Sequence, residues 1–208
     1  KKALHLNPDY AAAHNNLGVA LKSNGEIDAA INSYKQALKI RPDYADAHQN
    51  LSFAFLNTGR LKEGLDEYEW RWQTVTHLSN KRHFSQPLWD GIASLRNKTI
   101  LLWGEQGAGD VVMWSSCLSL VASHAEKCIL ECEEKLVPLF TRSFPNIEVK
   151  AENKSLDNHR DDFDFHLPMG SLFRHFTFEI SKDAKPDAFL ISDPVRVNLW
   201  RDRLSTLG

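Results

Sequence analysis

Two consecutive stretches of equal length decide the fold of the first part of the chain: AAAHNNLGVALKSNGEIDAAINSYKQALKIRPDY (11–44) and ADAHQNLSFAFLNTGRLKEGLDEYEWRWQTVTHL (45–78). Each is 34 residues long. Aligned without gaps, they pair Asn16 with Asn50, Leu17 with Leu51, Gly25 with Gly59 and Tyr34 with Tyr68. The opening stretch KKALHLNPDY (1–10) matches KQALKIRPDY (35–44). An internal repeat of this length predicts stacked copies of one supersecondary unit.

The apolar residues within each unit predict a helical hairpin. Two runs with apolar residues three and four positions apart flank a turn that contains glycine. In the first unit Leu17, Ala20 and Leu21 form one stripe, and Ile27, Ala30, Ile31 and Tyr34 form the other. One hairpin cannot bury both stripes, so neighbouring units must stack.

This pattern resembles the tetratricopeptide repeat through Leu17-Gly18, Ala30, Tyr34 and Pro42. The second unit departs from the family pattern at Ser52, Gly64 and Thr76. The resemblance implies an α-helical solenoid over residues 1–78, made of the end of one repeat and two full units. Because the chain opens within a unit, we expect it to be a fragment with further repeats upstream.

The resemblance also implies a concave surface, lined by the first helix of each unit, that binds a peptide or protein partner. Its candidate peptide-binding residues are Asn15, Asn16, Val19, Gln49, Asn50 and Phe53. A side-chain amide carries donors and an acceptor, so Asn16 and Asn50 can hold an extended peptide backbone of any sequence. The alternative is that these amides only solvate a helix surface. His14 and His48, which also recur, are interpreted as packing residues.

The composition bears on compartment and partners. The formal net charge of −2 provides no basic field for nucleic acid. No apolar run approaches the ~20 residues that a membrane helix needs. The three cysteines have the spacing of neither a disulfide framework nor a metal site. We therefore expect a cytoplasmic protein without a metal or cofactor.

The second half of the chain has a different pattern. Residues 79–98 are polar, with a proline and an Asp-Gly turn, and are the expected linker. From residue 99, strand-like TILLW (99–103), CILECE (128–133), IEVKAE (147–152) and FDFHLP (163–168) alternate with helix-like stretches. The last, residues 193–208, opens with Asp193 as N-cap and closes with Gly208. The alternation predicts an α/β domain at 99–208, with a parallel sheet covered by helices on both faces.

This half resembles the N-terminal, Rossmann-like domain of GT-B glycosyltransferases, in particular heptosyltransferase-like enzymes and the bacterial ones that follow tetratricopeptide repeats. The resemblance rests on LWDG (88–91), KTILLWGEQGAGD (98–110), DFHLPMGSL (164–172) and FLISDPVRVNLWRDRL (189–204). It implies that the parent transfers a sugar from a nucleotide-sugar bound largely by a C-terminal domain. That domain is not in this chain, so we expect the fragment to be inactive. The alternative is a degenerate transferase half that serves as a scaffold.

The loop GEQGAGD (104–110) follows the first predicted strand, at the edge where ligands bind such sheets. It is not a Walker loop, because no Gly-Lys-Ser/Thr follows. The order GxxGxG makes a poor dinucleotide fingerprint, although Glu131 lies where a ribose-binding acid is expected. Two interpretations remain: a tight turn with Asp110 as N-cap or, from the resemblance, an acceptor site with Asp110 as catalytic base.

The remaining candidate substrate-binding residues lie in this loop and near the fourth strand: Glu105, Gln106, Gly107, Ala108, Gly109, His166 and Ser171. Glu105 and Gln106 either orient an acceptor or are simply solvated. His166 either lines the cleft or is packed in the core. Ser171, with the backbone of Met169-Gly170, forms another edge of the predicted site.

Overall fold

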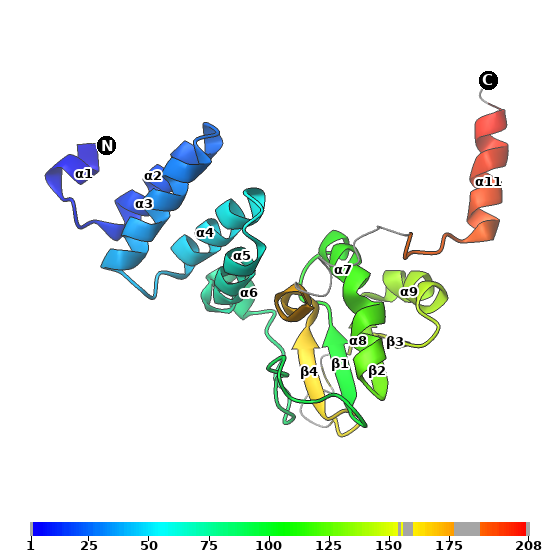
Figure 1. Cartoon of the computed structure of the whole chain (residues 1–208). Helices are drawn as coiled ribbons and strands as arrows, with labels where there is room; N and C mark the ends of the chain where they lie inside the picture. The colour runs from blue at the N-terminus through cyan, green and yellow to red at the C-terminus, as the bar shows by residue number, and fades with distance from the viewer. Residues whose placement is uncertain (1, 154, 156–159, 177–187, 207–208) are drawn as a thin grey trace. The chain divides into compact units, whose positions relative to one another are not determined.

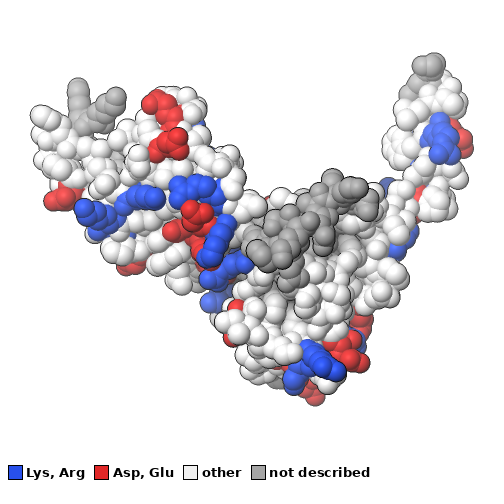
Figure 2. All heavy atoms as spheres, in the orientation of Figure 1, with Lys and Arg blue, Asp and Glu red and all other residues white. Residues whose placement is uncertain are grey.

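The structure is a computed structural model that describes residues 2–153, 155, 160–176 and 188–206 (Figure 1). It divides into two compact units, Lys1–Lys81 and Arg82–Gly208. Among the described residues, no helix combines the length and apolar character that a membrane span requires. Figure 2 shows acidic and basic side chains interspersed on the visible face of each unit.

The N-terminal unit is a series of antiparallel helices. The end of one repeat is α1 (Lys2–Leu6); α2 (Ala11–Ser23) and α3 (Ile27–Ile40) form the first full hairpin; α4 (Ala45–Asn57) and α5 (Leu61–Tyr68) form the second (Figure 1). Gly25 and Gly59 occupy the same place in the two hairpin turns, with φ of +83° and +74°. These left-handed conformations are readily adopted only by glycine, which explains the repeated glycine.

The core of this unit joins the two hairpins. Ala30, Ile31 and Tyr34 of α3 pack with Leu51, Ala54 and Phe55 of α4. The departures in the second unit are accommodated locally: Ser52 is fully buried and its Oγ donates to the Gly64 carbonyl at 2.7 Å. A Cβ on Gly64 would lie 2.8 Å from Leu56 Cδ2, so this position requires glycine.

The last helix of the repeats is short. It is α5, which stops at Tyr68 and is followed by a 3₁₀ segment, η1 (Glu69–Gln73), and by α6 (Val75–Leu78). Arg71 is wholly buried and its Nη1 donates to the Tyr68 carbonyl. Thr74 Oγ1 donates to the Arg71 carbonyl at 2.7 Å. These bonds satisfy carbonyls that a continuing helix would have used.

The second unit contains a four-stranded parallel sheet in the order β3-β2-β1-β4. Its strands are β1 (Thr99–Trp103), β2 (Lys127–Cys132), β3 (Glu148–Ala151) and β4 (Phe165–Pro168). The predicted strands are thus confirmed as parallel. Between them lie α7 (Ala108–Trp114), η2 (Ser115–Cys117), α8 (Leu118–His124), η3 (Glu134–Leu136) and α9 (Val137–Ser143) (Figure 1).

The two faces of the sheet are covered differently, unlike the prediction of helices on both. Right-handed crossovers from β1 to β2 and on to β3 place α7, α8 and α9 on the same face. The opposite face carries Trp103 and Glu131, which are register partners. Phe84 and Arg82 lie against these two residues. In the described part of the chain, a preceding segment rather than a helix covers this face.

The segment expected as a linker, 79–98, is largely part of the second unit. The Trp89 N–H donates to the His166 carbonyl at 2.9 Å, and the His166 N–H donates to the Pro87 carbonyl at 3.2 Å. Leu88 thereby forms an isolated parallel bridge to β4. Trp89 and Leu95 are buried, so most of this segment is held on the sheet unit.

The chain ends in α11 (Pro194–Ser205), which follows η5 (Met169–Ser171) and a short helical stretch at 172–176. The predicted N-cap is confirmed: the Asp193 carboxylate accepts from the N–H groups of Val195 and Arg196. The predicted closing residue, Gly208, lies outside the described residues.

Candidate functional site

A solvent-facing surface on α2 and α4 gathers most of the predicted peptide-binding residues. We call it the α2/α4 surface and define it by Asn16, Val19, Lys22, Gln49, Asn50 and Phe53. On α2 consecutive members are three positions apart, and on α4 Phe53 lies three and four positions after Asn50 and Gln49, so each set shares one side of its helix. Val19 is 42% exposed and Phe53 is 38% exposed. The two residues are 34 positions apart and occupy the same place in successive repeats.

Asn15 differs from the expectation that it faces a peptide. It is only 5% exposed, and its Oδ1 accepts a hydrogen bond from Asn50 Nδ2 at 3.0 Å. The Asn50 amide therefore links the first helices of two repeats, and Asn50 is half-buried. Asn16 is exposed.

Lys22 lies next to the apolar part of this surface. Its Nζ is 5.4 Å from the centre of the Phe53 ring, a distance at which an ammonium group is attracted to the ring face. The other neighbour of the Phe53 ring is Tyr68, whose ring centroid is 6.3 Å away. The surface thus combines amides, two exposed apolar side chains and one cation.

The recurring histidines are packed and hydrogen-bonded. His14 Nε2 and His48 Nε2 each lie 2.8 Å from a proline carbonyl, that of Pro8 and of Pro42 respectively. His48 also contacts Glu67 through Nδ1 and stacks on Trp70 at 3.8 Å between ring centroids. The two histidines fasten each repeat to the turn before it.

In the second unit, the loop 104–110 lies at the carboxyl end of β1 and begins α7. The N-cap is Gly107, in an extended conformation, and its carbonyl accepts from the N–H groups of Asp110 and Val111. The interpretation of Asp110 as N-cap is therefore wrong, because the helix starts two residues before it, at Ala108. Asp110 is half-buried in the first turn of the helix, where the helix dipole favours a carboxylate.

The loops after β1 and β4 meet. Glu105, predicted to be solvated or to face an acceptor, is buried and its Oε2 accepts from the Gly170 N–H at 3.3 Å. Ser171, which follows Gly170 in the chain, is also buried. Gln106 and Ala108 are half-buried, whereas Gly107 and Gly109 are exposed. The loop that contains Asp110 is thus joined to the chain just after β4 by the hydrogen bond between Glu105 and the Gly170 N–H.

His166 lies within β4 rather than at its end, and it is buried. Trp103 Nε1 donates to His166 Nδ1 at 3.3 Å. Because an indole nitrogen is only a donor, that imidazole nitrogen is the acceptor in this contact. Phe84 contacts the same ring, at 4.6 Å between centroids. Of the two interpretations of His166, the geometry favours packing.

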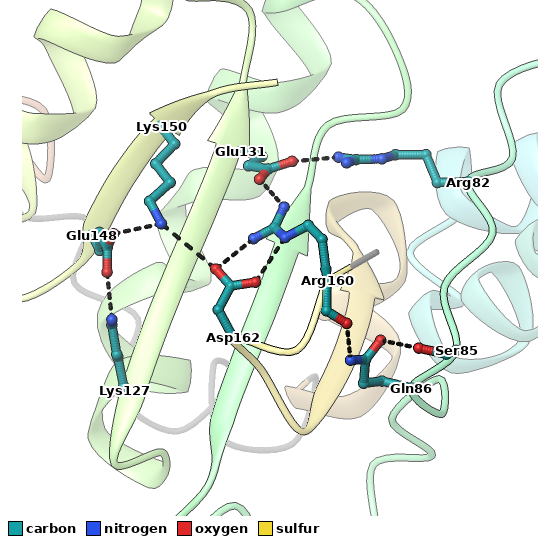
Figure 3. A network of polar contacts seen from close by, with 9 residues as sticks. All are labelled: Arg82, Ser85, Gln86, Lys127, Glu131, Glu148, Lys150, Arg160 and Asp162. Carbon is teal, nitrogen blue, oxygen red and sulfur yellow. Dashed lines mark hydrogen bonds and ion pairs between the residues drawn. The ribbon is translucent and has the colours of Figure 1, made fainter. Parts of the chain in front are cut away.

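A polar network that the sequence did not predict lies on the face opposite the helices (Figure 3). Glu131 is 3% exposed and pairs with both Arg82, at 2.7 Å, and Arg160. Asp162 accepts hydrogen bonds from Arg160, which hold the pKa of its carboxyl below the usual range. The chain of contacts continues through Lys150 to Glu148 and Lys127. Each oxygen of the Glu131 carboxylate pairs with an arginine, an arrangement that does not favour the ribose-binding role.

Two family models match the first unit. The model described as TPR repeat covers residues 20–59, and the one described as tetratricopeptide repeat covers residues 1–32. The N-terminal unit contains tetratricopeptide repeats. The two matches and the paired hairpins α2–α3 and α4–α5 confirm the prediction for this part of the chain.

One curated relative aligns with both the tetratricopeptide repeats and the α/β unit. Protein FlbA of Caulobacter vibrioides is 28% identical over 226 residues, which is 100% of this chain and 37% of FlbA. The chain thus spans little more than a third of that relative's length.

Solved structures similar to part of the chain include those of MamA and YrrB. The crystal structure of MamA has 28% identity, covers 38% of this chain and 46% of its own, and gives a TM-score of 0.34. YrrB, described as a TPR protein with an unusual peptide-binding site, has 25% identity. The match covers 35% of this chain and 37% of the YrrB chain, with a TM-score of 0.34.

Five of the predicted peptide-binding residues lie on the α2/α4 surface: Asn16, Val19, Gln49, Asn50 and Phe53. Asn15 is instead buried beneath that surface and accepts a hydrogen bond from Asn50. Their role in binding stays a prediction. Lys22 belongs with them, and its spacing from Val19 on the same helix is the sequence signal for it.

Proposed function

We propose that the tetratricopeptide-repeat unit binds an extended segment of another protein on the α2/α4 surface. The observation that carries this proposal is the paired placement of Asn16 with Asn50 and of Val19 with Phe53, each 34 residues apart on adjacent helices. Amides at this interval offer donors and acceptors to a peptide backbone. The exposed Val19 and Phe53 provide apolar area for its side chains.

The experiment screens an array of peptides for binding to the whole chain. A peptide that binds is then titrated into variants of the chain. Asn16→Ala is the informative change, because Asn16 is exposed and its loss leaves the Asn15–Asn50 hydrogen bond in place. Loss of one amide contact is expected to weaken binding by about 1 kcal/mol, or about fivefold in Kd. Asn57→Ala, at the exposed end of α4, is the matched control. Equal affinities for both variants would exclude the amide contact.

For the second unit we propose a role as the acceptor-binding half of a sugar-transferring enzyme. Two observations support it. The strand order β3-β2-β1-β4 is that of the first half of a doubly wound nucleotide-binding sheet. The loops after β1 and β4 also meet at the carboxyl ends of their strands, where Glu105 accepts from the Gly170 N–H. Asp110 would act there as the base that takes the acceptor hydroxyl proton.

This second role is tested by Asp110→Asn in the complete protein, assayed for transfer from nucleotide-sugars. Asn removes the proton acceptor and preserves the shape of the side chain, so turnover is expected to fall by about 10²–10⁴ while the melting temperature stays close to wild type. Asp110→Ala is the comparison for stability. An active Asp110→Asn enzyme would leave the loop as a structural turn. No transfer by any form would favour a scaffold role.

A further inference from the structure

We propose that the α2/α4 surface selects extended peptides in which an apolar and an acidic side chain stand two residues apart. This selectivity rests on the peptide binding proposed above and adds to it the chemistry of the ligand. Its basis is the arrangement of Val19, Phe53 and Lys22.

The apolar part of the ligand is set by Val19 and Phe53. Two other large apolar residues of α4 are enclosed: Leu51 is 2% exposed and Phe55 is 3% exposed. Phe53 in contrast presents its ring to solvent, with Tyr68 against one part of it. An aliphatic or aromatic side chain laid on Val19 and Phe53 would remove this area from water, which favours binding.

The acidic part of the ligand is set by Lys22. Within the described part of the chain, no Asp or Glu lies within ion-pair distance of its ammonium group, which contacts the Phe53 ring instead. A cation next to apolar surface attracts a carboxylate on the ligand and repels a cation. Next to Phe53, the surface is thus complementary to an acidic side chain and unfavourable to a basic one.

The spacing of the two side chains follows from the geometry. In an extended peptide, residues i and i+2 point to the same side and are about 7 Å apart, whereas i and i+1 point to opposite sides. Lys22 Nζ lies 5.4 Å from the Phe53 ring centre. A side chain resting on the ring therefore leaves the acid at i+2 or i−2 within reach of Lys22, and an acid at i+1 faces away.

The test uses fluorescently labelled dodecapeptides with a glycine-serine background and the complete chain. Four peptides carry Leu with Asp at i+2, Leu with Asp at i+1, Leu with Lys at i+2, and Ser with Asp at i+2. The first is expected to bind best, with Kd about two- to fivefold lower than that of the i+1 isomer, the range for one exposed ion pair. The Ser peptide is expected to bind about tenfold more weakly, since it lacks the apolar anchor.

Charge reversal provides the decisive arm. The Lys22→Glu variant is expected to bind the peptide with Leu and Lys at i+2 more tightly than the peptide with Leu and Asp at i+2. Lys39→Glu makes the same change of net charge on the exposed face of α3 and should keep the wild-type order. Phe53→Ala should weaken all three Leu peptides about tenfold.

The possible failures are distinguishable. Binding that depends on Asn16 but not on Lys22, Phe53 or the spacing would overturn the proposed selectivity and leave the peptide-binding function standing. If no peptide binds here or in the array screen, both fail. Retained preference for the Leu–Asp peptide by Lys22→Glu would overturn the acidic part of the proposal.

Discussion

Asn50 Nδ2 donates a hydrogen bond to Asn15 Oδ1 at 3.0 Å and so joins the first helices of two successive repeats. Asn16, the residue that follows Asn15 in the chain, is exposed. Two adjacent amides of one repeat thus have different environments: one is internal and the other is offered to solvent. Of the amides predicted to bind a peptide, Asn15 and Asn50 thus also form a structural contact between the repeats.

This hydrogen bond should be measurable as a coupling between the two residues. Asn50→Ala removes the donor and leaves the buried Asn15 amide unsatisfied, so it is expected to cost about 1–3 kcal/mol of the free energy of unfolding. Asn15→Ala leaves a partly exposed amide that water can satisfy, and should cost about 1 kcal/mol. The double variant should be no less stable than Asn50→Ala. Urea denaturation followed by circular dichroism measures all three, and strictly additive effects would contradict the coupling.

Gly18→Ala should destabilise the repeat unit. A Cβ at this position would lie 2.4 Å from Tyr34 Cε1 and 2.6 Å from Cδ1. Tyr34 is completely buried. We expect a loss of about 1–3 kcal/mol from this overpacking. Ala20→Ser, on the exposed side of the same helix, is the control and should lie within about 0.5 kcal/mol of wild type. A Gly18→Ala protein as stable as the control would refute the close approach of α2 and Tyr34.

Glu131→Gln should strongly destabilise the sheet unit, because it leaves the buried Arg82 without its carboxylate. Breaking one side of a buried pair costs about 3–5 kcal/mol. Glu148→Gln is the control, since Glu148 pairs with lysines at the surface and should cost less than about 1 kcal/mol. Replacing Arg82 and Glu131 together by Met and Leu should recover part of the loss. Similar midpoints for Glu131→Gln and Glu148→Gln in urea would show that the network is not buried in solution.

The sheet unit should also lose stability in acid. Hydrogen bonds from Lys98 and the Thr99 N–H lower the pKa of Asp164, and Lys127 and Lys150 lower that of Glu148. A carboxyl whose pKa is lower in the folded state stabilises that state above its unfolded pKa of about 4, and this stabilisation is lost as the pH falls through the folded pKa. Unfolding in urea between pH 7 and pH 3 measures the decrease. Asp164→Asn should show a smaller decrease below pH 4, and an unchanged slope would contradict the assignment.

The sequence by itself determined the repeats, because their signals are local. Gly25 and Gly59 stand where the turns need positive φ, and the apolar stripes recur at helical spacing within each unit. The parallel strands were also readable, as apolar runs of strand length separated by helix-like stretches. Asp193 was predictable as an N-cap because the residues it bonds follow it directly.

Only the tertiary structure decided which polar residues face each other. Arg82, Glu131 and Arg160 are far apart in the chain, and they meet where both arginines pair with the Glu131 carboxylate. The burial of Asn15 depends on the approach of α4, and that of His166 on Trp103 and Phe84. Helix start and strand alternation follow from neighbours in sequence, whereas burial and hydrogen-bond partners follow from contacts that the packed chain alone brings together.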